Sequence, residues 1–97
     1  KQTAEIVERK IQRASSEQVD ASVTLNAVEP GRYSVKATLV EIDRRKGFVP
    51  LATVETAKTI DGTETLTLPF KVNSNGRRFV LQDVVVKDLT RMLVLTH

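Results

Sequence analysis

Alternation of apolar and polar residues is the feature that most limits what this chain can fold into. Every second side chain is apolar over one nine-residue stretch, at Val19, Ala21, Val23, Leu25 and Ala27. Residues 33–39 repeat the pattern. Because successive side chains of a strand point to opposite faces, both stretches predict strands with one buried and one solvated face. After Leu39 the apolar phase slips to Val40 and Ile42, which predicts a β-bulge.

Turn-forming residues divide the rest of the chain into further strands. Proline, glycine, asparagine and aspartate gather at residues 29–31, 43–47, 61–62 and 73–76. The segments between them predict strands at 48–58, 65–72, 79–86 and 91–96. Pro50 lacks a backbone donor, which places its segment at a sheet edge or at a strand start. The last two segments are almost continuously apolar, as is typical of strands inside a packed sheet.

The first fifteen residues fit two structures. Ile6, Val7, Ile11 and Ala14 would form one face of a helix, and the local composition suits a helix. The same stretch could open the sheet, and six strands elsewhere favour a seventh. The expected fold class is therefore all-β: one domain over residues 1–97, an antiparallel sandwich or barrel of about seven strands.

Composition excludes several classes of protein. The chain has no cysteine, so disulfides and thiolate metal sites are excluded. The net charge of +3 is scattered rather than gathered in one block, which argues against a dedicated nucleic-acid binder. No apolar run is long enough to predict a membrane span. Because the chain begins at Lys1, we expect a domain excised from a larger protein.

The basic stretch at residues 44–51 (RRKGFVPL) resembles the start of an RNA-recognition strand. Lys46, Gly47 and Phe48 match the beginning of that signature. Its later aromatic positions, which would stack on bases, hold Pro50 and Thr53 instead. The stretch therefore predicts a basic hairpin tip, with Phe48 anchoring the strand that follows.

No residue constellation predicts catalysis, a cofactor or a metal site. His97, the only histidine, is the last residue, where a rigid triad would be hard to hold. Glu41 and Asp43 would share a strand face, but two arginines follow them, as in a solvated strand end. The segment 61–64 has too few acids for a calcium loop. The expectation is that the protein is not an enzyme.

Three polar side chains near predicted strands have structural interpretations. The phase of Tyr33 places its ring in the core, with the hydroxyl reaching a partner. Asp83 and Asp88 flank a run of valines. They could cap strand ends, or pair with a basic residue among Arg77, Arg78 and Arg91.

Several segments resemble a known kind of module. Residues 30–39 (PGRYSVKATL) are similar to the PGRYxVxAxL segment of C-terminal immunoglobulin-like modules in uncharacterised exported proteins of Gram-negative bacteria. The similarity continues at 50–52, at 65–70 (TLTLPF) and at 79–84 (FVLQDV), and ends with Arg91 and Met92. The shared positions are core and turn residues, which report fold rather than activity. The turn at 73–76 is shorter than the connection such modules often carry.

The resemblance implies an immunoglobulin-like (fibronectin-like) sandwich, located in the periplasm or outside the cell. It carries over no catalytic residue. The first functional hypothesis is a non-catalytic accessory or interaction module, whose partners are other domains of the same chain or another protein, without nucleic acid. The alternative is a module that binds a polyanion, an acidic polysaccharide or nucleic acid. Its candidate residues are Arg44, Arg45, Lys46, Arg77 and Arg78. The alternative requires their two loops to lie at the same end of the fold.

Overall fold

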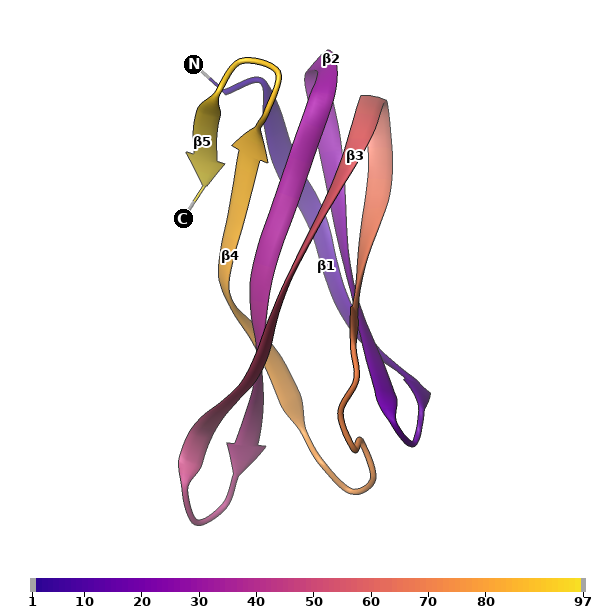
Figure 1. Ribbon diagram of the computed structural model, residues 1–97, viewed down its shortest axis with the longest axis vertical. Coiled ribbons are helices and arrows are strands. Elements are labelled where there is room, and N and C mark those ends of the chain that lie inside the picture. The colour runs from indigo at the N-terminus through magenta and orange to yellow at the C-terminus, as the bar shows by residue number, and fades with distance from the viewer. Residues whose placement is uncertain (1, 97) are drawn as a thin grey trace.

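The computed structural model describes residues 2–96 and is all-β (Figure 1). Five antiparallel strands form one sheet that is not closed: β1 (Ala4–Ser15), β2 (Gln18–Asp43), β3 (Gly47–Phe70), β4 (Phe79–Asp88) and β5 (Leu93–Thr96). The start of the chain is thus a strand and not a helix. The molecule is elongated, with extents of 43 × 23 × 17 Å.

Strand β2 organises the sheet because every long strand pairs with it. Its first half lies between β1 and the second half of β3, and its second half lies between the first half of β3 and β4. β5 continues the sheet beyond β4, which it pairs with only over residues 86–88 of β4. The sheet therefore has unpaired edges along β1, along β3 and along most of β4.

The expected seven strands are five, because at two of the predicted turns the chain changes direction without losing its strand pairing. Residues 29–31 and Asp61–Gly62 lie inside β2 and β3, at a shared bend. The register passes from Ala27↔Gly62 to Gly31↔Ile60, so residues 28–30 of β2 oppose only Asp61. Gly62 has a φ of 84°, which suits glycine. Proline and glycine bend two paired strands together here and do not end them.

The bend folds the sheet back on itself, so that side chains from both halves meet in one core. Five alternating residues of the first half of β2, from Val19 to Ala27, lie in the same buried cluster as Tyr33 and Leu39 of its second half. Leu66, Leu68 and Phe70 of β3 and Val84 and Val86 of β4 complete it. The two alternating stretches of sequence therefore mark the two halves of one core.

Other local predictions have mixed outcomes. The slip after Leu39 is a bulge, and Pro50 lies on the free-edge side of the sheet in β3. The prediction that Phe48 anchors its strand is wrong, since 63% of its surface is exposed. The β2–β3 hairpin extends past the start of β4 at Phe79, so no strand covers this ring. The strand predicted at 91–96 is present as β5, but its predicted place inside a packed sheet is wrong, because β5 is an edge strand whose Leu93 and Val94 are exposed.

A buried polar cluster fixes the bend to both ends of the chain. Asp88, whose side chain is fully buried, accepts hydrogen bonds from Thr3 Oγ1 (2.7 Å), Arg91 Nη1 (2.8 Å) and Arg91 N (2.9 Å). The guanidinium of Arg91 also donates to the Pro30 carbonyl at 2.9 Å. Of the pairings left open for Asp88, the structure therefore selects Arg91. This cluster joins the start of β1, the β2 bend and the β4–β5 turn.

The Tyr33 hydroxyl belongs to the same region and confirms its predicted place in the core. It lies 2.7 Å from the Glu29 carbonyl oxygen and 3.2 Å from that of Thr3. We expect Tyr33→Phe to lower the free energy of unfolding by about 1 kcal/mol, because it removes a buried donor and leaves the ring in place. Urea unfolding of the two proteins measures this difference. An unchanged midpoint would show that the hydroxyl adds nothing to the bend.

Candidate functional site at the basic end

Three chain connections gather at the end of the molecule opposite the bend, at the bottom of Figure 1. They are the β1–β2 turn, the β2–β3 turn and the connection from β3 to β4. Ser74, in the third, donates its hydroxyl to the Ser15 carbonyl at 2.7 Å and its amide to the Ser16 carbonyl at 2.9 Å. The third connection is thereby fixed to the first.

The two basic loops named from the sequence lie side by side at this end. The Ile42 amide donates to the Arg78 carbonyl at 2.9 Å, which places the β3–β4 connection against the end of β2. A hollow of about 470 Å³ lies between them. Its lining residues are Glu41, Ile42, Asp43, Arg44, Arg45, Gly76, Arg77 and Arg78. The geometric requirement of the polyanion hypothesis is therefore met, and these residues are called the basic end below, together with Lys46.

The acids of the basic end are occupied by local contacts. Asp43 Oδ1 accepts the backbone amides of Arg45 (2.8 Å) and Lys46 (2.9 Å), which shapes the tight β2–β3 turn. Those amides, that of Lys46 first, lower the pKa of Asp43. Glu41 Oε2 lies 3.4 Å from Arg77 Nε and partly neutralises that arginine. Glu41 and Asp43 thus have separate structural partners.

Four of the five candidate cations remain without an acidic partner. Among residues 2–96, no ion pair involves Arg44, Arg45, Lys46 or Arg78, and all four side chains are exposed. Arg77 is half-buried and paired, so its role is to support the hollow more than to present charge. The basic end therefore offers positive charge on two rigidly connected loops, around a concave surface.

Some residues of this end carry no signal in the sequence. Arg13 of β1 reaches over to the Arg77 carbonyl, which its Nη2 contacts at 3.4 Å. This contact depends on the position of β1 beside the β3–β4 connection, which no local pattern in the sequence predicts. The Glu41–Arg77 pair likewise joins segments far apart in the chain, so no local spacing could have predicted it.

The family model described as "Domain of unknown function (DUF4785) C-terminal domain" matches residues 3–97. The chain belongs to this family. No curated protein matches the DUF4785 C-terminal domain described here.

The other segment considered as a binding site in this DUF4785 domain, residues 61–64, makes contacts within the domain. In segment 61–64, the Asp61 amide contacts Glu64 Oε2 at 3.3 Å and Lys58 pairs with Glu64 Oε1 at 3.1 Å. Within residues 2–96, no group of three or more histidines or acids gathers as metal ligands. The same part of the chain has no helix with the length and apolarity needed to cross a bilayer. His97 lies outside the described residues.

Proposed function

We propose that this DUF4785 domain is a non-catalytic interaction module, an immunoglobulin-like unit of a larger exported protein, and that its basic end binds a polyanion. One observation carries the choice of site: two loops distant in sequence bring three unpaired cations, Arg44, Arg45 and Arg78, to the rim of one hollow, and Lys46 follows in the same turn. Fixed positive charge on a concave surface attracts anionic ligands and speeds their association. The exported location and the immunoglobulin-like classification both rest on the sequence resemblance, and the bent, all-β core supports only the classification.

An acidic polysaccharide fits this end better than a nucleic acid does. Proteins that hold single-stranded nucleic acid usually stack successive bases on several aromatic rings. Near the basic loops only Phe48 presents an exposed ring among the described residues. A sulfated or carboxylated polysaccharide requires charge and no stacking platform. The remaining free edges and the rest of the parent chain leave room for protein partners elsewhere on the domain.

Salt dependence and a charge-matched pair of variants test the proposal. With about four cations engaged, heparin affinity should fall roughly fiftyfold between 50 and 200 mM salt, because bound counterions are released. The triple variant Arg44→Ala, Arg45→Ala, Arg78→Ala should weaken heparin binding at least about tenfold at 50 mM salt and flatten the salt dependence. Isothermal titration or heparin-column elution measures both effects.

The matched control removes the same charge elsewhere. Arg32→Ala, Lys36→Ala and Lys87→Ala together also lower the net charge by three, but they lie on strands away from the basic end. This control should keep most of the affinity. Equal losses of heparin affinity in the two triple variants would show that only the overall charge matters, and would refute a localised site. Tighter binding of a single-stranded oligonucleotide than of heparin would replace polysaccharide by nucleic acid as the ligand.

A further inference from the structure

A groove runs along the opening of the sheet, between β1 and β4. Both strands are antiparallel to β2, and each has a free edge: the outer side of β1, and the stretch 79–85 of β4 below its pairing with β5. Two adjoining hollows, of about 210 and 310 Å³, follow this opening and share Arg9. Their lining is mixed: the polar residues are Gln2, Glu5, Arg9 and Lys10, and the apolar ones are Ala4, Ile6, Ile11, Phe79, Val80, Leu81, Val86 and Leu95.

Each of the two strands that border the groove carries a bulge. In β1 the register shifts between Ile6 and Glu8. In β4 the irregularity lies opposite residues 36–38 of β2, where Asp83 has a φ of 53°. Bulges bend and twist a strand and interrupt its ladder, a common way to protect an edge from indiscriminate pairing. The groove is therefore built into the two strands that border it.

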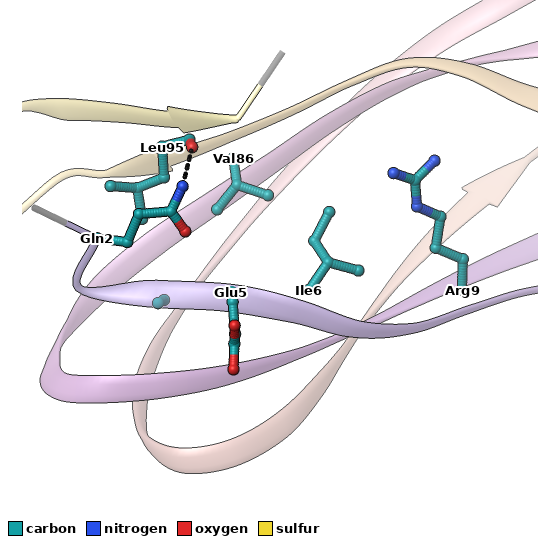
Figure 2. Close-up of a pocket in the computed structure, with 7 residues that line it drawn as sticks. Gln2, Glu5, Ile6, Arg9, Val86 and Leu95 are labelled. Atoms are coloured by element: carbon teal, nitrogen blue, oxygen red, sulfur yellow. Dashed lines mark hydrogen bonds between the residues drawn. The ribbon is translucent and has the colours of Figure 1, made fainter.

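The β1 bulge also turns a cation toward the groove. Below it, Arg9 pairs in register with Val23 and Ile11 with Ala21, so both share the face that β2 turns to the core. Figure 2 shows Ile6 and Arg9 projecting from β1 to the side where Val86 and Leu95 lie, while Glu5 points the opposite way. No acid within residues 2–96 pairs with Arg9. The Arg9 side chain is exposed, so its charge is open to an acidic group in the groove.

β5 already shows how an added segment would lie. It runs antiparallel to β4 and occupies the upper part of the opening, where Nε2 of Gln2, which precedes β1, donates to the Leu95 carbonyl at 3.2 Å (Figure 2). Because β1 and β4 run in opposite directions (Figure 1), a segment that continues the direction of β5 is antiparallel to β4 and runs in the same direction as β1. Below β5 the amides and carbonyls on this edge of residues 79–85 have no strand partner among the described residues.

We propose that the groove binds an extended peptide, which adds to the free edge of β4 as a strand in line with β5. Alternate residues of the peptide are apolar and pack toward Ile11, Phe79 and Leu81, and one inward residue is acidic and pairs with Arg9. Backbone hydrogen bonds along the edge supply affinity, while the alternating side chains supply specificity, as in other cases of strand addition. This site is separate from the basic end and does not depend on the function proposed for it.

Capped synthetic peptides, added to the intact domain, test the proposal. The probe is the seven-residue peptide VTETVTV, and its partner VTKTVTV reverses the inward charge. Wild-type protein should bind the glutamate peptide at least about tenfold more tightly than the lysine peptide. Arg9→Glu should reverse that preference, whereas Arg32→Glu, an exposed arginine of β2, should leave it unchanged. Fluorescence anisotropy measures the affinities.

Amide resonances locate the contact. The expected result is shifts and slowed hydrogen exchange at residues 79–85, together with shifts at 6–11. An N-methylated version of the glutamate peptide, which cannot complete the ladder, should not bind. Failure of both charged peptides to bind at millimolar concentration would overturn the proposal, as would shifts confined to the free edge of β3. Concentration-dependent self-association that produces the same shifts without peptide would assign the groove to a second copy of the chain instead.

Discussion

Replacing Asp88 by alanine is expected to lower the free energy of unfolding by about 3 kcal/mol, although the residue lies far from either proposed site. The side chain is fully buried and accepts three hydrogen bonds, two of them from Arg91. Its removal leaves the guanidinium of Arg91 without its closest anion and the Thr3 hydroxyl without its acceptor. Breaking one partner of a buried ion pair costs far more than the pair itself contributes.

Thermal or urea unfolding measures this loss, and an exposed aspartate supplies the control. A change of about 3 kcal/mol corresponds to a drop in Tm of roughly 15 °C for a domain of this size. Asp61→Ala, at an exposed position in β3, should change stability by less than about 0.5 kcal/mol. A loss below about 1 kcal/mol in Asp88→Ala would mean that the cluster does not fasten the bend.

The same residue gives stability a defined dependence on pH. Burial of Asp88 acts to raise its pKa, but the hydrogen bonds from Thr3 and Arg91 outweigh it and hold the pKa below its ordinary 3.8. Because the folded pKa is depressed, the carboxylate's contribution is complete above the unfolded value of about 3.9 and is lost as pH falls through the folded pKa. The stability difference between wild type and Asp88→Asn should therefore shrink below about pH 4, and a constant difference would contradict this.

The strands could be predicted from sequence because alternation reports directly which face is buried. The alternating stretches in 19–27 and 33–39 were sufficient to place most of the core residues of β2, and the phase slip after Leu39 located a bulge. The number of strands could not be predicted in the same way. Proline and glycine mark a change of backbone direction, and residues 29–31 look the same whether one strand ends there or two paired strands bend together and stay paired.

The two candidate sites also differ in how much of each could be predicted from the sequence. The basic loops were visible as runs of charge at 44–46 and 77–78, but only the pairing of Ile42 with Arg78 brings them to one hollow. The groove beside β1 had no signal at all, because it depends on a bulge that moves Arg9 onto the core-facing side. Local sequence indicates what a side chain is, whereas registers between distant strands decide what it faces.

Two phenylalanines give the sharpest test of that distinction between local pattern and register. Phe70 ends β3 in the core with 1% of its surface exposed, whereas Phe48, at the start of β3, is 63% exposed. Phe70→Ala should therefore cost about 4 kcal/mol, since it leaves a cavity where a ring was buried. Phe48→Ala, the same chemical change in the same strand, should alter stability by less than about 0.5 kcal/mol.

Urea unfolding of both variants measures the contrast, and a milder change protects the test against outright unfolding. If Phe70→Ala does not fold, Phe70→Leu should remain folded at a cost of about 1–2 kcal/mol, because it keeps most of the buried volume. Similar losses in Phe48→Ala and Phe70→Ala would restore the anchoring role that the local pattern predicts for Phe48. They would also show that the β2–β3 hairpin packs against more of the domain than β4 covers.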